Sequence, residues 1–302
     1  MSTETPATGA TQETPNDAPW VCVTCGHPAI HDYCSHCGEK RRETHDFSLR
    51  HILGEAAEAF FHVDSKILLS LKTLLSKPGR LTAEFFAGRR KPYMLPLQTF
   101  FVCNLIFFVL QPLTGLEILG PPLRAFDNSF LRSVVTPLVH GRLAKKHVSL
   151  DSPVQYEEFA ARFDQVSHLQ AKSLVLIMVP MLAVVLAFIH FRPRRFFSEH
   201  LVFALHAYAW WLLWLLGILT GMGILWIVMG AAGHPLSPGA LDWMATLLEF
   251  GGFGVYLFFA QRTFYRQSPM SALAKSLALV MGVYCIFHLY RLLLLFTVLY
   301  AM

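Results

Sequence analysis

Four cysteines near the N-terminus are the residues whose type and spacing most clearly indicate chemistry. Cys22, Cys25, Cys34 and Cys37 form two CxxC pairs separated by eight residues. A glycine follows the second cysteine of each pair, where it tolerates positive φ and lets backbone amides fold toward the thiolates. Four thiolates in a tetrahedron fill every position of a structural zinc site. The spacing therefore predicts a small zinc ribbon over residues 20–42.

Three other interpretations of these cysteines stay open. Two disulfides would need an oxidising compartment, and no secretory signal pattern precedes the cysteines. A rubredoxin-type iron site uses the same four thiolates. A histidine could replace one cysteine as a ligand, and the candidates are His27, His31 and His36. The basic run at 40–42 would offset the charge of about −2 that four thiolates leave on a zinc ion.

A second group of polar residues falls inside the apolar runs of the chain. Glu249 and Arg291 each lie about 12–13 Å below the expected outer edge of their spans, at a rise of 1.5 Å per residue. His288 is three residues before Arg291, and Asn104 lies midway along the first apolar run. Because a lone charge in lipid is expensive, we expect Glu249 to pair with Arg291. The group would be either a structural lock or a polar cavity for an ion or small solute.

A third group, Glu199, His200 and His206, occurs where another apolar run begins. Glu199 and His206 are seven residues apart and share a helical face, whereas His200 points elsewhere. These side chains are either satisfied residues at the membrane boundary or ligands of a second metal, although their spacing matches no standard ligand set. The sequence contains no phosphate-binding loop, serine-hydrolase elbow or zinc-protease motif, so we predict no catalytic residue. A membrane enzyme stays open as a third hypothesis, which would require these three side chains to line a pocket.

The composition shows what must position these residues. Of 302 residues, 54% are hydrophobic and only 15% are charged, whereas soluble proteins carry about 25% charged residues. This excludes a disordered chain, a nucleic-acid-binding domain spread along the whole length and an ordinary soluble enzyme. We expect an all-α polytopic membrane protein with five spans near the ~20 residues that a bilayer requires. They are Leu95–Leu113, Ser173–Phe191, Leu201–Met229, Leu241–Ala260 and Ala278–Tyr300.

The basic loops predict the orientation. Residues 190–200 and 261–275 carry Lys and Arg, whereas residues 230–240 carry none. Because basic short loops stay in the cytoplasm, the N-terminus should be cytoplasmic and the C-terminus outside. The loop at 114–172 is basic yet falls outside in this topology. We accept this exception because loops of about this length largely escape the positive-inside rule.

The segments outside the spans differ in character. Residues 1–19 have almost nothing to bury and predict a disordered tail. Residues 46–92 predict amphipathic juxtamembrane helices, lying in the headgroup plane or packed on a transmembrane bundle over 93–302. The outer loop 114–172 predicts a small helical cap, with amphipathic stretches around Phe126–Val139 and Val154–Leu169.

Two stretches carry a resemblance to a known family. The run YCSHCGEKRRETHDFSLRHIL and the later HVDSKILLSLKTLLSKPGRLTAEFFAGRRKPYMLPL resemble the bacterial family called domain of unknown function 3667. Tyr33 replaces the Phe before Cys34, and the later motif comprises Gly88, Arg90, Tyr93 and Pro96. The resemblance implies a bacterial membrane location and metal-binding cysteines, and it supplies no activity.

The hypothesis from sequence is a bacterial inner-membrane protein whose cytoplasmic zinc ribbon mediates protein interaction or assembly. Its expected cofactor is structural zinc, and its expected partners are membrane lipid and an unidentified protein, with no nucleic acid. The alternative is a small-solute or ion transporter built around Glu249, His288 and Arg291.

Overall fold

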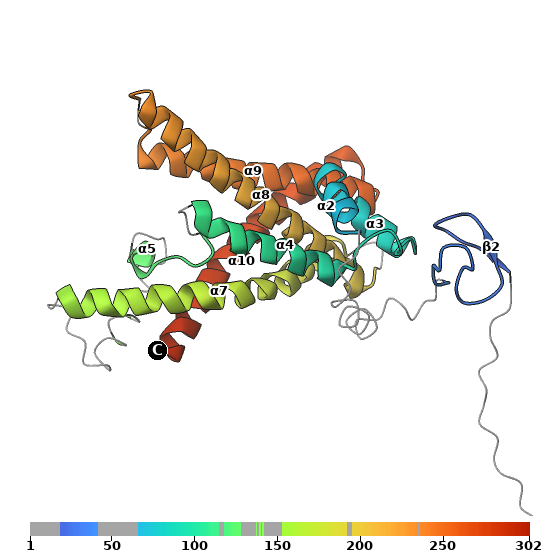
Figure 1. The fold of residues 1–302 in the computed structure, drawn as a ribbon, viewed down its shortest axis with the longest axis horizontal. Helices are drawn as coiled ribbons and strands as arrows, with labels where there is room; N and C mark the ends of the chain where they lie inside the picture. Colours follow the sequence, from blue (N-terminus) through green and yellow to red (C-terminus); the bar gives the residue numbers. More distant parts are fainter. Residues whose placement is uncertain are drawn as a thin grey trace, which may run out of the picture.

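The structure is a computed structural model of the chain. It describes residues 19–41, 66–114, 118–127, 137, 139, 141, 153–191, 195–234 and 236–302. The expected tail over 1–18 and the first part of the expected juxtamembrane segment, 46–65, lie outside these residues. Where it is described, the chain is mainly helical, with one two-stranded sheet near the N-terminus (Figure 1).

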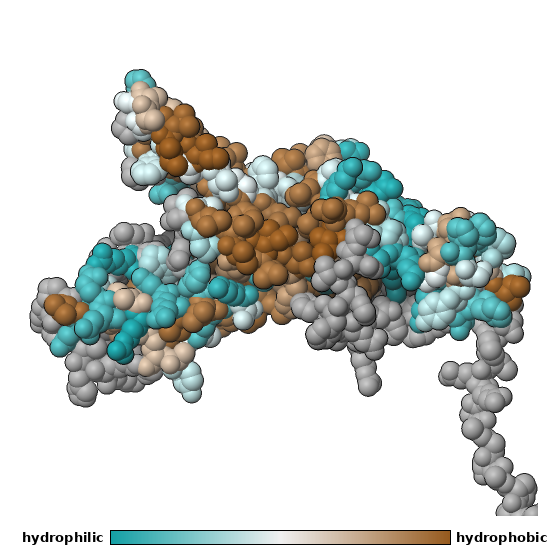
Figure 2. All heavy atoms as spheres, viewed as in Figure 1, coloured by the Kyte–Doolittle hydropathy of each residue, from teal (hydrophilic) through white to brown (hydrophobic). Residues whose placement is uncertain are grey.

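Among the described residues, five helices are long and apolar enough to cross a membrane, which confirms the expected fold class. They are α4 (Pro96–Leu110, extended by the 3-10 helix η2, Gln111–Thr114), α7 (Pro153–Ile189), α8 (Phe197–Ala231), α9 (Pro238–Phe264) and α10 (Pro269–Ala301). A helix satisfies its backbone hydrogen bonds internally, which is what the hydrocarbon core demands. The side chains match this environment: Figure 2 shows a brown apolar band over the middle of the bundle, with teal polar surface toward both ends.

The core of the bundle is rich in aromatic residues from α8 and α9. Trp211, Tyr208 and Phe253 are fully buried, and Trp210 stacks on Tyr256 with ring centroids 4.3 Å apart. Helix α4 packs mainly on α8, while α10 packs on both α7 and α9. The far ends of α8 and α9 leave the bundle as a projecting hairpin (Figure 1).

The outer loop is partly continuous with the second span. The amphipathic stretch expected around 154–169 and the span expected at 173–191 form the single helix α7. No glycine or proline separates the two stretches, so the helix continues across their junction. The short helix α5 (Leu123–Asp127) lies on α7, where the Leu123 N–H donates to the Asp164 carboxylate over 2.7 Å.

Two short helices, α2 (Lys66–Ser76) and α3 (Arg80–Phe86), precede the first span. Helix α3 packs against α8 and α9, and its Leu81, Thr82 and Phe85 are buried. Gly79, at the start of α3, has φ +76°, and a Cβ there would lie 2.5 Å from the Ala260 carbonyl oxygen. This part of the 46–92 segment therefore packs on the bundle.

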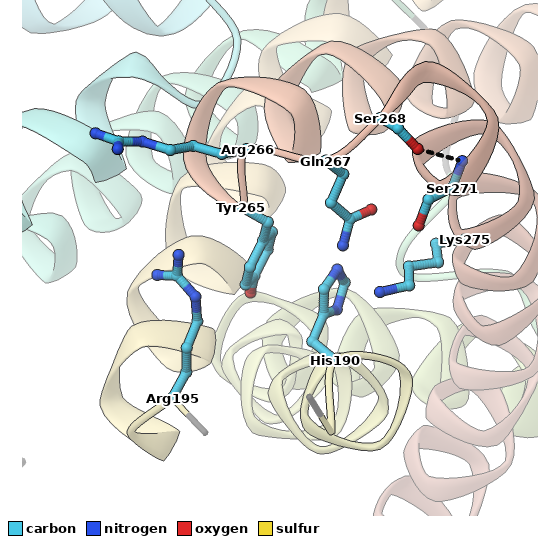
Figure 3. Close-up of a pocket in the computed structure, with 8 residues that line it drawn as sticks. All are labelled: His190, Arg195, Tyr265, Arg266, Gln267, Ser268, Ser271 and Lys275. Atoms are coloured by element: carbon cyan, nitrogen blue, oxygen red, sulfur yellow. Dashed lines mark hydrogen bonds between the residues drawn. The ribbon is translucent and has the colours of Figure 1, made fainter. Parts of the chain in front are cut away.

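One end of the bundle gathers polar residues from several helices. The turn between α9 and α10 lies beside the end of α7 and the residues before α8, so His190, Arg195, Tyr265 and Lys275 come close together (Figure 3). Helix α3 lies near the same ends of α8 and α9, because Thr82 contacts His206 of α8 and Gly79 abuts Ala260 of α9.

Candidate metal centre and polar residues of the bundle

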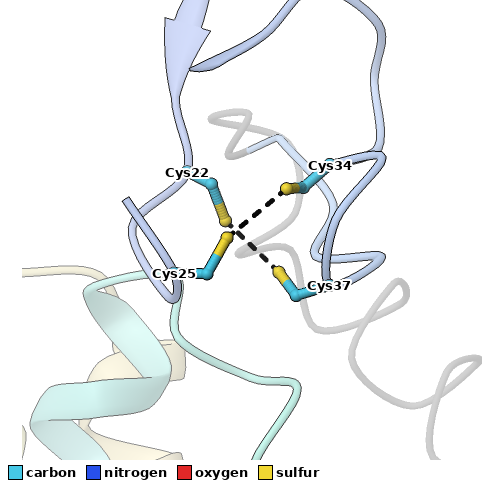
Figure 4. A group of neighbouring side chains, drawn as sticks. All are labelled: Cys22, Cys25, Cys34 and Cys37. Atoms are coloured by element: carbon cyan, nitrogen blue, oxygen red, sulfur yellow. Dashed lines mark hydrogen bonds between the residues drawn. The ribbon is translucent and has the colours of Figure 1, made fainter. Parts of the chain in front are cut away.

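The four N-terminal cysteines converge on one point (Figure 4). The Cys22 and Cys37 sulfurs are 3.5 Å apart, and those of Cys25 and Cys34 are 3.6 Å apart. Four sulfurs bound tetrahedrally at about 2.3 Å from a zinc ion would be separated by roughly 3.8 Å. All four thiols are free of disulfides. The donor set and its spacing fit a metal ion, so this group can bind one.

Two similar turns build the centre. In the first, the Cys22 carbonyl accepts from the Gly26 N–H over 2.8 Å; in the second, the Cys34 carbonyl accepts from the Gly38 N–H over 2.8 Å. Both glycines have positive φ, 76° and 70°, which other residues rarely adopt. The short strands β1 (Trp20–Val21) and β2 (Pro28–Ala29) pair antiparallel around the first turn.

The electrostatics of the centre favour a thiolate at Cys34, whereas burial and the neighbouring sulfurs outweigh the Glu39 N–H and raise the pKa of Cys37. The Cys37 backbone N–H points at the Cys34 sulfur and lowers the pKa of this thiol to about 7. A metal needs its cysteine ligands deprotonated, so this amide assists binding. The exposed His27 and His36 rings stack 4.1 Å apart beside Cys25, and these three residues form a second possible ligand group.

Glu39 joins the ribbon to the membrane part of the chain. Its side chain is only 3% exposed and accepts hydrogen bonds from the Thr24 hydroxyl over 2.7 Å and from the Lys91 N–H over 3.0 Å. A Cβ at Gly38 would lie 3.2 Å from Lys91 Cε, so the second turn packs closely here. The sequence pattern pointed to the cysteines but contained no sign of this acidic anchor.

Glu199, His200 and His206 have separate partners. Glu199 pairs with Arg195 and accepts from the Phe196 N–H at the start of α8. His200 Nδ1 is 2.8 Å from the Tyr265 hydroxyl, and His206 Nδ1 is 2.9 Å from the Thr82 hydroxyl. The three side chains thus tie α8 to three neighbouring segments and do not form one ligand set.

His190 and Tyr265 are polar residues at this end that sequence reasoning did not select. Their rings stack 3.9 Å apart, and Tyr265 also carries the bond to His200. Burial, together with the charge of Lys275, lowers the pKa of His190 to about 4. The available signal was the basic composition of the two loops at 190–200 and 261–275, which we used only to predict orientation.

The four residues expected inside the membrane are not brought together. Asn104 Nδ2 donates to the Lys172 carbonyl over 3.4 Å, and the Arg291 guanidinium lies over the Phe126 ring. His288 is half-buried, and its Nδ1 lies 3.0 Å from the Tyr284 carbonyl oxygen of its own helix. In the described part of the chain, no hydrogen bond or ion pair joins any two of Asn104, Glu249, His288 and Arg291.

The heights of Glu249 and Arg291 explain the missing ion pair. Counted from the α9–α10 turn, Glu249 lies 15 residues before Phe264, whereas Arg291 lies 22 residues after Pro269. The seven-residue difference corresponds to about 10 Å along the helix axes. Our expectation of matching depth assumed that α9 and α10 end level at the far side, but the start of α9 belongs to the projecting hairpin (Figure 1).

A family match covers the segment that leads into the first span. Residues 64–108 match the model of a family described as "Protein of unknown function (DUF3667)". This match confirms the resemblance found in the sequence. It spans α2, α3 and most of α4, and the four cysteines lie outside it. No curated protein and no solved structure gives a significant match to the chain.

Proposed function

We propose that this chain is a multi-pass membrane protein whose four-cysteine module binds structural zinc and serves as a protein-interaction or assembly module. The observation that carries the proposal is the convergence of four sulfurs, with closest separations of 3.5 and 3.6 Å, in a closed set with no position left for a substrate. Zinc would organise a segment that is too short to bury a hydrophobic core of its own.

The surface of the module supports a role in recognition. Val21 and Ile30 are 66% and 56% exposed. Val21 pairs with Pro28 in the sheet, and Ile30 directly follows the end of β2. Val23 and Tyr33 are also exposed. Side chains of this kind on a small rigid module are typical of a protein contact surface.

The position of the module also supports the proposal. Glu39 holds it against Lys91, between α3 and the first span. A partner bound to the module would therefore be held near the end of the bundle that carries the basic α9–α10 turn. With the orientation expected from the basic loops, this end faces the cytoplasm, where cysteines stay reduced.

Two sets of substitutions test the proposal. The double variant Cys34→Ser with Cys37→Ser should lose zinc binding. It should also lose the crosslink to the partner protein that the wild-type chain forms in native membranes. Val21→Asp with Ile30→Asp should keep one zinc per chain and still lose that partner, because only exposed side chains change. Zinc is measured by elemental analysis of purified protein, and membrane insertion should be intact in both variants. An unchanged set of crosslinked partners in both variants would refute the interaction role, and a metal-free wild-type protein would refute the zinc site.

The alternative, transport through Glu249, His288 and Arg291, has less support. Among the described residues no hydrogen bond or ion pair joins these side chains: His288 bonds within its own helix, and Arg291 lies over the Phe126 ring. If Glu249→Gln changed the flux of an ion across reconstituted vesicles, the transport hypothesis would replace the one proposed here.

A further inference from the structure

A cavity of about 300 Å³ lies at the end of the bundle where α7 ends and α10 begins. Four segments contribute its walls: the end of α7, the residues before α8, the α9–α10 turn and the first turns of α10 (Figure 3). It is independent of the cysteine module. In the described part of the chain, three cations line this cavity, namely Arg195, Arg266 and Lys275, and no carboxylate does.

The three cations have different roles. Arg195 is paired with Glu199, and its guanidinium lies over the Phe264 and Tyr265 rings. The Arg266 side chain extends away from the centre of the cavity (Figure 3). Lys275 points toward His190 and forms no ion pair with any described residue (Figure 3). The available positive charge in the cavity is therefore that of Lys275.

The N-terminus of α10 adds to the positive electrostatic potential in the cavity. Ser268 caps the helix by accepting from the Ser271 N–H, and both serines line the cavity. The N-terminus of a long helix carries a partial positive charge and attracts anions. This feature alone would not define a site.

His190 provides the second, independent observation. It is only 3% exposed and borders the cavity; its buried Nε2 atom forms no hydrogen bond of normal geometry, although the Gln261 side chain lies close to the ring. Its Nδ1 lies 3.1 Å from the Leu186 carbonyl oxygen, which can only accept a hydrogen bond. Nδ1 therefore carries the proton in the neutral ring, and the unpartnered Nε2 is a hydrogen-bond acceptor.

A ligand for this cavity must therefore satisfy two demands. It needs anionic oxygens for the Lys275 ammonium, and it needs a proton to donate to His190 Nε2. A carboxylate or sulfate carries no such proton at neutral pH, whereas a phosphate monoester and inorganic phosphate both interact as anions and can retain a P–OH group. We propose that this cavity binds a phosphate monoester or inorganic phosphate, with Lys275 holding the anionic oxygens and His190 Nε2 accepting from the P–OH.

The first experiment uses inorganic phosphate with the full-length protein in detergent. Binding measured by equilibrium dialysis with labelled phosphate should be saturable and resist competition by sulfate at pH 7. Lys275→Gln should weaken binding about tenfold or more, because a charge-assisted hydrogen bond is lost. Lys72→Gln is the matched control, since Lys72 is an exposed cation on α2 that does not line the cavity.

A second variant tests the role of the histidine. His190→Phe keeps a ring of similar shape against Tyr265 but removes the acceptor. Binding should weaken, and the preference for phosphate over sulfate should disappear. If this variant fails to fold, the Lys275→Gln result and the sulfate competition in the wild-type protein still decide the matter.

The third arm separates the two sources of this chemistry. In nanodiscs, phosphatidic acid presents a phosphate monoester, whereas phosphatidylglycerol presents a diester without P–OH. If phosphatidic acid but not phosphatidylglycerol raises the unfolding temperature of the protein, and Lys275→Gln loses this effect, the ligand is a lipid headgroup. Binding of inorganic phosphate without this lipid effect would identify a soluble phosphate. The proposal is overturned if neither binds, or if Lys275→Gln and Lys72→Gln behave alike.

Discussion

Gly79 shows at the scale of one residue how closely α3 approaches the bundle. A Cβ at this position would lie 2.5 Å from the Ala260 carbonyl oxygen, and the backbone has φ +76°. Gly79→Ala should therefore destabilise the protein through both steric overlap and left-handed strain, the latter costing about 1–2 kcal/mol. The matched control is Gly233→Ala, where φ is +78° and nothing lies within 4 Å. Thermal unfolding in detergent should show the larger loss for Gly79→Ala, and equal losses would contradict the close contact.

The buried His190 makes stability depend on pH. Its pKa is lowered from 6.5 to about 4 by burial first and by the Lys275 charge second. Between these values the unfolded chain binds a proton that the folded chain does not, so stability falls as the pH falls from 6.5 to 4. At pH 5 this single group should cost about 2 kcal/mol relative to neutral pH.

The measurement compares wild type with His190→Phe in phosphate-free buffer. The drop in unfolding temperature between pH 7 and pH 5 should be smaller in the variant. Arg195, His200 and Lys275, the ionisable groups around His190, are present in both proteins, so their contributions largely cancel in the comparison. Equal drops would mean that His190 does not titrate as its burial requires.

At the scale of elements, a hydrogen bond from the Lys91 N–H to Glu39 joins the ribbon to the segment before the first span. Glu39→Ala removes the acceptor of the Lys91 N–H but leaves the four thiolates in place. We expect hydrogen exchange at the Lys91 amide to rise about tenfold, as the loss of one charge-assisted bond implies, with zinc content unchanged. The control is Thr24→Ala, which removes another bond to Glu39 and leaves the Lys91 bond intact. If exchange at Lys91 is unaffected by Glu39→Ala, the ribbon is not anchored at this point.

At the scale of the whole molecule, α8 is long enough to hold the loops at its two ends on opposite sides of a membrane. Its 35 residues extend about 52 Å, so Phe196 and His234 lie near opposite ends. Two single variants, Phe196→Cys and His234→Cys, are treated in intact cells with a membrane-impermeant maleimide. Only one of the two variants should be labelled more strongly than the unsubstituted protein. The positive-inside rule predicts labelling of His234→Cys.

Permeabilised cells provide the control, because both positions are exposed and both cysteines should then react. Labelling of Phe196→Cys alone in intact cells would invert the expected orientation. Labelling of both would mean that α8 does not span the membrane.

The sequence by itself determined the features that depend on neighbouring residues. Two CxxCG turns carry their own ligand spacing and their own glycines, so the cysteine centre could be predicted from local spacing alone. Five helices long and apolar enough to cross a membrane followed from hydropathy, because lipid demands a local solution to backbone hydrogen bonding.

Only the tertiary structure decided which distant residues meet. Sequence reasoning paired Glu249 with Arg291 on the assumption that their helices end level, and the projecting α8–α9 hairpin separates them in height. It treated the basic loops as markers of orientation, whereas the fold brings Lys275 and His190 from separate helices to one cavity. The physical reason is that hydropathy determines which segments enter the bilayer, while the heights and rotations of the helices come from side-chain packing between them.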